Sequence, residues 1–269
     1  SELKKLWTEA GLPWQTLLWY PRALLWPENI EMGTELPGYK QNLFYPMNAS
    51  SLIPVLELDV QPNETVLDAC AAPGGKALFI LEFVSGERGR LIANESSPKR
   101  RARLQETLRN FGATSAEVWS YRAETLFKNT AMRFDKILVD APCSSEKHVM
   151  QSPKHLAQWS RGRIRDLSYR QLALLSGLFL LLKEGGRMVY STCAITPEEN
   201  EAVVAKFLNK KSGTVRLCAP DKALPGASGI PGSRHCDLTK VRRIWPRADS
   251  QLDPMFVAIF EKTSATDTA

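Results

Sequence analysis

Short apolar segments alternate with segments of helical pattern from residue 65 onward. The apolar segments lie at residues 66–71, 90–95, 116–120, 136–141 and 187–193. Short apolar runs bounded by turn residues are typical of buried strands. Helical patterns cover residues 98–112 and about 168–183, and another helix is expected from Pro197, where residues 196–199 (TPEE) resemble a capping box. The alternation predicts an α/β fold with a mostly parallel, doubly wound sheet.

The two ends of the chain differ from this alternating part. Residues 255–262 (MFVAIFEK) predict a last, antiparallel edge strand, and the Pro-, Gly- and Ser-rich stretch 219–254 predicts a surface loop. Residues 1–40 contain four of the seven tryptophans, interrupted by prolines, which favours short turns over one long helix. We therefore expect a Trp-rich N-terminal extension at residues 1–40 and one main domain at 41–269. Packing of the tryptophans in a core is favoured over base stacking, because tryptophan buries a large area.

Charge and cysteine content narrow the classes of partner. The chain has 35 Lys and Arg against 29 Asp and Glu, and its pI is about 9.1, which is compatible with a polyanionic partner. The five cysteines are odd in number and form no CxxC pair, which argues against a disulfide framework or a zinc site and favours a reducing compartment. The longest apolar run, residues 172–182, is shorter than the roughly 20 residues of a membrane-spanning helix. We expect no metal and no membrane association.

Candidate chemistry gathers where the predicted strands end. Ligands of open α/β sheets bind beyond the carboxyl ends of the strands, so the residues that follow each strand lie together. Gly74 and Gly75 follow the first strand and permit a tight turn close to a ligand. Glu95 ends the second strand, 20 residues after Gly75, at a position suited to binding ribose hydroxyls. We expect a nucleoside-containing cofactor, although a purely structural turn is the alternative and neither GxGxxG nor a P-loop is present.

Two cysteines end two further predicted strands. Cys143 closes the segment DAPC, and Cys193 closes the segment VYSTC. Free cysteine is commonly buried, so packing explains either thiol taken alone. Two thiols at strand ends beside a cofactor turn instead indicate a reactive site.

Three motifs, taken in this order, resemble one family. CAAPGGK at residues 70–76, DAPCS at 140–144 and YSTC at 190–193 look like the Sun family of S-adenosylmethionine-dependent RNA 5-methylcytosine methyltransferases. The resemblance extends over about residues 38–262 and implies a Rossmann-like class I methyltransferase fold with S-adenosylmethionine as cofactor. The stretches NASSLIPV, SPKRRARL and PMF most resemble a short branch that includes mitochondrial members. The expected compartment is the cytoplasm or, alternatively, the mitochondrial matrix.

The resemblance also implies roles for individual residues. Cys193 would add to cytosine C6, Cys143 would assist product release, and Asp140 would contact the N3/N4 edge of the base, with Lys76 also in the catalytic set. The cofactor would lie against Cys70, Ala71, Ala72, Pro73, Gly74, Gly75, Lys76, Glu95, Arg100, Arg122 and Asp140. Arg122 departs from the family pattern, which has an aspartate near the adenine. Glu124 is the candidate substitute, and weaker adenine contact is the alternative.

The expected function is methyl transfer from S-adenosylmethionine to a cytosine in rRNA or tRNA. A catalytically weak RNA-binding or ribosome-assembly factor is the alternative, which Arg122 favours. A DNA cytosine methyltransferase is a third hypothesis, but such enzymes do not need the Cys193 thiol. RNA would contact two basic clusters, for which solvated helix faces are the competing explanation. The clusters are Lys99, Arg100, Arg101 and Arg103, and Arg161, Arg163, Arg165 and Arg170. Target choice would rest on the N-terminal extension or on a protein partner.

Overall fold

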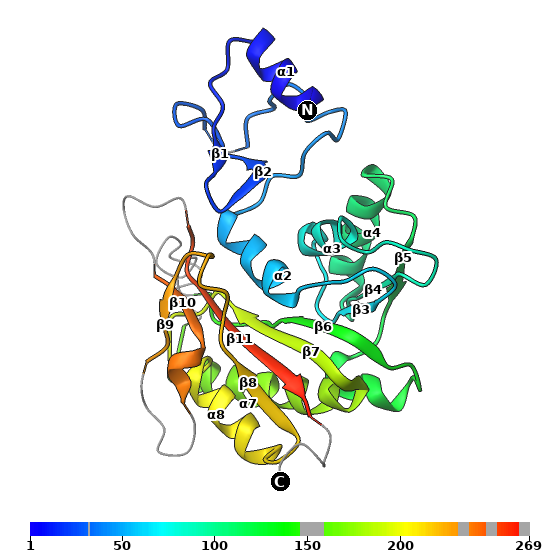
Figure 1. Ribbon diagram of the computed structural model, residues 1–269, viewed down its shortest axis with the longest axis vertical. Coiled ribbons are helices and arrows are strands. Elements are labelled where there is room, and N and C mark those ends of the chain that lie inside the picture. The colour runs from blue at the N-terminus through cyan, green and yellow to red at the C-terminus, as the bar shows by residue number, and fades with distance from the viewer. Residues whose placement is uncertain (32, 146–158, 231–236, 246–251, 264–269) are drawn as a thin grey trace. The chain divides into compact units, whose positions relative to one another are not determined.

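The chain divides into two compact units in the computed structural model (Figure 1). The structure describes residues 1–31, 33–145, 159–230, 237–245 and 252–263. One unit comprises Ser1–Met47 with Lys222–Pro225, and the other comprises Asn48–Asp221 with Gly226–Ala269. The first unit thus extends past residue 40, where the sequence placed the end of the extension.

The first unit is built from one short helix, a two-stranded ribbon and turns. Helix α1 (Glu2–Glu9) is followed by the antiparallel strands β1 (Thr16–Leu17) and β2 (Tyr20–Leu24). Trp7 is 2% exposed, packs edge-on against Phe44 and donates its indole N–H to the Pro37 carbonyl at 3.0 Å. The prediction of short turns is confirmed, and Trp7 is a core side chain of this unit.

The second unit contains a sheet to which nine strands of the described residues belong (Figure 1). The strands are β3 (Thr65–Asp68), β4 (Arg90–Asn94), β5 (Ala116–Trp119), β6 (Phe134–Asp140), β7 (Leu182–Thr192), β8 (Val215–Cys218), β9 (Ala227–Ser228), β10 (Arg242–Ile244) and β11 (Met255–Lys262). Their order is β5-β4-β3-β6-β7-β11-β10-β9, and β8 also pairs with β11. Strands β3 to β7 are parallel, whereas β8 to β11 are antiparallel to their neighbours. The strand order reverses between β3 and β6, which is where α/β sheets bind ligands.

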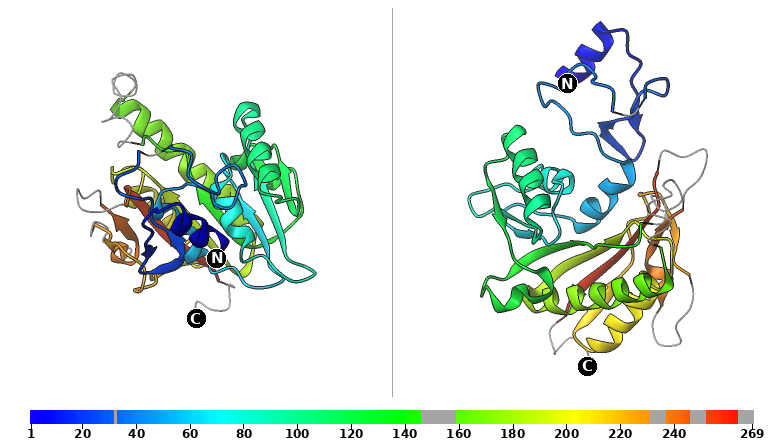
Figure 2. Two further views of the ribbon diagram at one scale, coloured as in Figure 1. Left: turned by 90° about the horizontal axis from the view of Figure 1, so that it is seen from above. Right: turned by 180° about the vertical axis from the view of Figure 1, so that it is seen from behind.

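Helices cover both faces of this sheet (Figures 1 and 2). One face carries α2 (Ile53–Leu58), α3 (Gly75–Leu81) and α4 (Pro98–Asn110), and the other carries α7 (Arg161–Leu178) and α8 (Glu201–Lys210). Short 3₁₀ helices are η1 (Ala49–Leu52), η2 (Ala123–Lys128), η3 (Phe179–Leu181) and η4 (Leu238–Lys240). In the main core, Leu174, Leu178 and Phe207 of α7 and α8 are buried with Tyr190 and Phe260 of the sheet. Burial stabilises each such side chain by about 1.5–3 kcal/mol and so holds the strand ends in place.

The doubly wound, mostly parallel sheet is confirmed, but the position of its last strand is not. β11 is antiparallel as predicted, yet it is not an edge strand, because β7 pairs with one side of it and β8 and β10 share the other. The six residues from Met255 to Phe260 are all buried. An apolar run predicts a buried strand but cannot tell which strands lie beside it.

The stretch 219–254 is not only a surface loop, since it contains β9, η4 and β10. Arg242 and Arg243 on β10 are 4% and 3% exposed. Arg242 pairs with Glu57 of α2 at 3.0 Å, and Arg243 donates to Glu201 of α8 at 2.6 Å. Buried charges persist when they are paired in this way. The polar composition of this stretch predicted an exposed loop. The sequence does not reveal the burial of its two arginines, because the carboxylates that pair with them belong to other elements.

Two helix boundaries also differ from the prediction. Helix α8 begins at Glu201 with Asn200 as its N-cap residue, so the capping box expected at residues 196–199 is wrong. Glu199 turns inward and is fully buried. The apolar helix ends at Leu178, is followed by η3, and β7 then begins at Leu182 rather than at residue 187.

Candidate active site

Cys143 and Cys193 lie side by side beyond the carboxyl ends of β6 and β7. The two strands are parallel neighbours with Asp140 opposite Ser191, and the Ala141 amide donates to the Ser191 carbonyl at 2.9 Å. This register brings the two cysteines together. Their Sγ atoms are 3.0 Å apart, and both residues are partly exposed. The structure therefore joins the two predicted catalytic thiols in one site.

Ser145, which the sequence analysis did not single out, completes the thiol cluster. Its hydroxyl lies 2.9 Å from Cys193 Sγ and 3.7 Å from Cys143 Sγ. The hydrogen bond from Cys143 lowers the pKa of Cys193 against the effect of burial, and Ser145 adds to the lowering. The same contact, followed by burial, raises the pKa of Cys143. Cys193 is thus the thiol that ionises first, as a nucleophile requires.

Lys76 and Asp140 form an ion pair next to the thiols. Lys76 Nζ, in the first turn of α3, lies 2.8 Å from Asp140 Oδ2, and the Ser191 hydroxyl donates to Asp140 Oδ1 at 2.8 Å. Burial lowers the pKa of Lys76, but the Asp140 and Asp68 carboxylates outweigh burial, so the pKa is raised. The charged ammonium favours the ionised form of the Cys193 thiol.

Asp68 lies at the end of β3 and is electrostatically coupled to this pair. It is 1% exposed, and neither carboxyl oxygen has a hydrogen-bond partner among the described residues, although the nearby Cys70 amide favours its ionised form. Burial, followed by the charge of Asp140, raises the pKa of Asp68 to about 7. Carboxyls perturbed in this way are typical of functional sites. Asp68 was not among the predicted site residues, because a strand-end aspartate has no distinctive pattern of its own.

The glycine turn after β3 packs against α4. Gly74 has φ +119°, and a Cβ at this position would lie 3.0 Å from Thr107, so only glycine fits. Ala71 and Ala72 are buried beside it, while Pro73 is exposed. Burial, and then the Asp68 charge, raise the pKa of the Cys70 thiol, so this third cysteine remains protonated.

Arg100 and Glu95 meet at this turn as the sequence predicted. Arg100 donates to the Ala72 carbonyl at 2.9 Å, and its guanidinium lies 3.1 Å from Glu95 Oε2. Glu95 is 4% exposed, and its Oε1 accepts the Ser97 amide at 2.8 Å. Glu95 Oε2 makes no hydrogen bond within the described residues. This oxygen is held by the Arg100 charge but can still accept a hydrogen bond at the end of β4.

Arg122 is exposed and occupies the N-cap position of η2. Glu124, its candidate substitute near the adenine, accepts a hydrogen bond from Arg170 of α7 at 2.6 Å. Glu124 is thus tied to α7. Contact of Arg122 or Glu124 with a cofactor remains a prediction.

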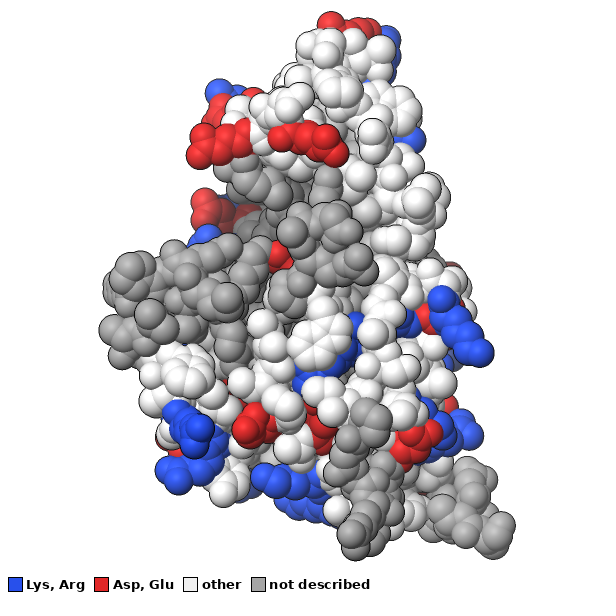
Figure 3. Space-filling view, turned by 90° about the vertical axis from the view of Figure 1, so that its left-hand side faces the viewer, with Lys and Arg blue, Asp and Glu red and all other residues white. Residues whose placement is uncertain are grey.

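Some residues of the two basic clusters bind other residues of the chain. In the first cluster, Arg100 binds the glycine turn and Arg101 donates to the Glu95 carbonyl at 3.2 Å, whereas Lys99 and Arg103 are exposed. In the second, Arg170 holds Glu124. On the face shown in Figure 3, Lys and Arg side chains are interspersed with Asp and Glu. RNA contact by the exposed members remains a prediction.

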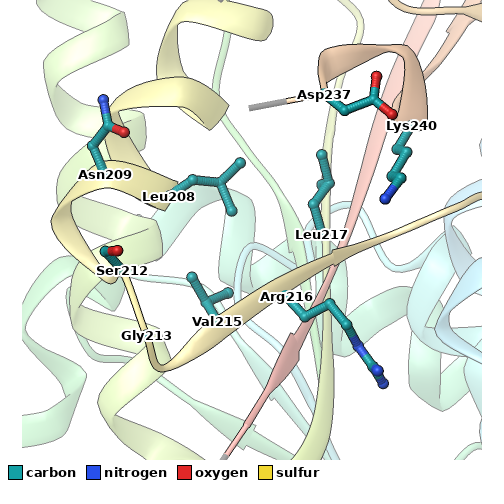
Figure 4. Close-up of a pocket in the computed structure, with 9 residues that line it drawn as sticks. All are labelled: Leu208, Asn209, Ser212, Gly213, Val215, Arg216, Leu217, Asp237 and Lys240. Carbon is teal, nitrogen blue, oxygen red and sulfur yellow. The ribbon is translucent and has the colours of Figure 1, made fainter. Parts of the chain in front are cut away.

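A cavity of about 300 Å³ lies elsewhere, between α8, β8 and η4 (Figure 4). Its lining residues are Leu208, Asn209, Ser212, Gly213, Val215, Arg216, Leu217, Asp237 and Lys240. The thiols and the glycine turn contribute nothing to it. Within the described ranges, no group of His, Cys, Asp or Glu side chains could hold a metal ion. No helix in that part of the chain is long and apolar enough to cross a membrane.

Fold and site together define a class of protein. A parallel sheet with a reversed strand order, a glycine turn after β3 and an acidic end to β4 define a Rossmann-like cofactor-binding fold. The thiol pair adds two candidate nucleophiles to that fold. Comparison with protein families makes the assignment specific: the chain belongs to the 16S rRNA methyltransferase RsmB/F family, whose model matches residues 55–261.

Individual relatives extend this result. The chain is 32% identical over 246 residues to the ribosomal RNA small subunit methyltransferase F of Aeromonas salmonicida, covering 90% of this chain and 50% of the relative. It is 33% identical over 230 residues to the tRNA (cytosine(49)-C(5))-methyltransferase of Pyrococcus abyssi, covering 85% and 73%. The crystal structure of a methyltransferase homolog from Pyrococcus horikoshii matches with a TM-score of 0.80 at 26% identity, covering 98% and 82%. This chain therefore spans half the length of the first relative.

Proposed function

We propose that the protein is an S-adenosylmethionine-dependent RNA (cytosine-5)-methyltransferase that acts through a covalent bond between Cys193 and cytosine C6. The observation that carries this proposal is the pair of thiols 3.0 Å apart beside the Lys76–Asp140 ion pair. Cytosine C5 is a poor nucleophile, and addition of a thiolate to C6 makes it reactive. Membership of a methyltransferase family supports the assignment.

The residues around the glycine turn fit S-adenosylmethionine. Glu95 Oε2 faces the Arg100 guanidinium at 3.1 Å and makes no hydrogen bond among the described residues, so it can accept one from a ribose hydroxyl. The buried Asp68 carboxyl likewise has no hydrogen-bond partner for either oxygen among those residues. The turn at residues 70–76 lies between these carboxyls, and Arg100 holds it by donating to the Ala72 carbonyl. When bound, the cofactor supplies an electrophilic methyl group on a sulfonium. Arg122 is the residue of the predicted cofactor set that fits least, because it is exposed and carries the opposite charge to the family's aspartate.

The residues at the ends of β6 and β7 divide the chemistry between attack and release. The Cys193 thiolate forms a bond to C6, and the C5–C6 electron pair shifts toward C5 and the N3 edge, where Asp140 binds the base. C5 then takes up the methyl group. Its hydrogen leaves as a proton to water, and the C5–H electron pair re-forms the C5–C6 double bond. The C6–S bond breaks and returns the thiolate to Cys193. Cys143 lies 3.0 Å from that sulfur and assists this release.

The RNA target, a partner and the compartment belong to the same proposal. The named relatives act on rRNA in one case and on tRNA in the other, so both are candidate substrates. The target cytosine must be unstacked to reach thiols set at strand ends. A protein partner or the Trp-rich first unit selects the RNA. The compartment is the cytoplasm or the mitochondrial matrix, because two thiols this close must be kept reduced to function.

A direct assay tests this function. The full chain is incubated with S-adenosylmethionine and with rRNA or tRNA in separate reactions, and bisulfite sequencing locates protected cytosines. We expect one RNA to gain a protected cytosine, and Cys193→Ala to gain none. Arg122 is the feature that favours the weakly catalytic assembly factor. RNA binding without any protected cytosine would support that alternative.

A further inference from the structure

Glu199 is a buried carboxylate behind the loop that carries Cys143. It is 0% exposed, and it accepts hydrogen bonds from the Ser144 amide at 3.1 Å, from the Ser144 hydroxyl and from Gln171 Nε2 at 2.8 Å. Gln171 Nε2 also donates to the Pro142 carbonyl at 2.9 Å. The residues on both sides of Cys143 are therefore held by Glu199 and its partner Gln171.

Asn200, the next residue, makes the equivalent contacts around Cys193. Its Oδ1 accepts from the Thr192 hydroxyl at 2.6 Å, and its Nδ2 donates to the Ala194 carbonyl at 2.9 Å. Asn200 is also 0% exposed. The dipeptide Glu199–Asn200 thus binds the residues that flank each thiol. The Glu199 side chain binds the loop that carries Cys143, and the Asn200 side chain binds the residues on either side of Cys193.

The dipeptide is itself anchored. Tyr190 of β7 donates its hydroxyl to the Glu199 carbonyl at 2.6 Å, and the Val204 amide of α8 donates to the Asn200 carbonyl at 3.1 Å. A buried acid that accepts several hydrogen bonds is costly to misplace, because each lost bond leaves a buried polar group unpaired. The arrangement resists small shifts of either thiol.

We propose that Glu199 and Asn200 are positioning residues that together set the separation of the two thiols. Glu199 holds Cys143 where it resolves the adduct, and Asn200 holds Cys193 where it attacks. The roles of attack and release rest on the proposed function, but the positioning itself does not. The Glu199 charge also opposes ionisation of Cys143, which adds to the effects of Cys193 and of burial in raising its pKa.

The first test measures thiol reactivity without RNA. The full chain carrying Glu199→Gln is alkylated with iodoacetamide, and mass spectrometry follows Cys143 and Cys193 separately. Glutamine keeps the shape but removes the charge and turns one acceptor into a donor facing Ser144. We expect the ratio of the Cys143 rate to the Cys193 rate to rise by at least about threefold, because thiolate population controls alkylation. Glu198→Gln is the matched control, since Glu198 is the exposed neighbour, and its ratio should equal that of the wild type.

A second pair of variants keeps the test valid if Glu199→Gln does not fold. Ser144→Ala keeps the Glu199 charge but removes one hydrogen bond that holds the Cys143 loop, so Cys143 should become more accessible and the ratio should rise by a smaller factor. Asn200→Asp replaces the donor to Ala194 and should lower Cys193 alkylation more than Cys143 alkylation. Thermal unfolding identifies the folded variants. The positioning role is overturned if folded Glu199→Gln or Ser144→Ala has the wild-type ratio, or if Asn200→Asp slows both thiols equally.

The RNA reaction then separates this inference from the proposed function. With a methylatable RNA, Glu199→Gln should accumulate protein linked to RNA through Cys193, whereas Asn200→Asp should lose linkage and methylation together. If the alkylation ratios change as expected but wild-type protein methylates no RNA, the positioning holds and the proposed function fails. If Glu199→Gln methylates and releases RNA at the wild-type rate, the positioning role in release is wrong.

Discussion

The two halves of the site are held in different ways. The thiol half, at the ends of β6 and β7, is a connected network in which Cys193 contacts Cys143 and Ser145, and buried side chains bind the flanking residues. The proposed cofactor half, at the ends of β3 and β4, contains two buried acids with unused hydrogen-bonding capacity among the described residues. Neither Asp68 oxygen has a hydrogen-bond partner, and Glu95 Oε2 has only the ion pair with Arg100. Lys76 and Asp140 lie between the halves.

The difference matches what each half has to do. Bond formation at carbon needs groups that are already oriented before the substrate arrives, because their reorganisation would add to the barrier. A cofactor that exchanges after each turnover needs polar groups that its own hydroxyl and amino groups satisfy. We therefore expect substitutions in the thiol half to affect chemistry and substitutions in the cofactor half to affect cofactor affinity.

The largest effect is expected where the halves meet. Lys76→Met removes the cation between Asp140, Asp68 and the Cys193 thiolate, and should lower the rate of methylation by about 10²–10³-fold. Lys183→Met is the matched control, because Lys183 also pairs with an aspartate of β6, Asp135 at 2.8 Å, at the other end of that strand. Single-turnover methylation measures both. Equal losses in the two variants would contradict a special role for Lys76.

Glu95→Ala should weaken the cofactor half alone. Loss of the carboxylate leaves ribose hydroxyls unpaired at a cost of about 1–3 kcal/mol. Calorimetry with S-adenosylmethionine measures the affinity, and Glu106→Ala on the exposed side of α4 is the control. An unchanged affinity would remove Glu95 from the cofactor site.

Asp68 should make stability depend on pH. Its pKa is raised from 3.8 to about 7 in the folded chain, so the folded state binds a proton more tightly than the unfolded state. Stability is then lost as pH rises from about 4 to about 7, with a slope of up to about 1.4 kcal/mol per pH unit. Asp68→Asn should remove this dependence, so its unfolding free energy relative to wild type should increase over that range and level off above it. Denaturant unfolding at several pH values measures this, and a constant difference would contradict the raised pKa.

The smallest effect is expected at Arg122. If this residue weakens contact with the adenine, Arg122→Asp should tighten S-adenosylmethionine binding by about 1 kcal/mol, the size of one net hydrogen bond. Arg122→Ala separates removal of the cation from gain of the acid. Calorimetry that finds no gain for the aspartate variant would mean that this chain forms its adenine pocket in another way.

Much of the parallel half of the fold follows from the sequence. The apolar runs that end at Asp68, Asp140 and Cys193 are short, bounded by turn residues and alternate with helices, so their strands and the common edge were predictable. Once β6 and β7 are adjacent parallel strands, their register brings Cys143 and Cys193 together. Motif order made the site's main residues recognisable.

The rest of the fold depends on contacts between residues far apart in the sequence, which no local sequence pattern predicts. β11 was misplaced at the edge because its partners β8 and β10 lie in segments of polar or mixed composition. Arg242 is buried because Glu57, 185 residues away, pairs with it. Glu199 was expected to cap a helix, since TPEE fits that pattern, but its carboxylate instead binds Ser144. In each case tertiary contacts override local preference.

The separate roles of the two thiols, attack by Cys193 and release by Cys143, are tested most directly by one denaturing gel. Wild-type protein, Cys193→Ala and Cys143→Ala are each incubated with S-adenosylmethionine and a methylatable RNA. Cys143→Ala should accumulate a slower band of protein linked to RNA through Cys193, because blocking release leaves the adduct in place. Cys193→Ala should form no such band and no 5-methylcytosine. A slower band with Cys193→Ala in place of Cys143→Ala would reverse the roles, and methylation by both variants at the wild-type rate would contradict the covalent mechanism.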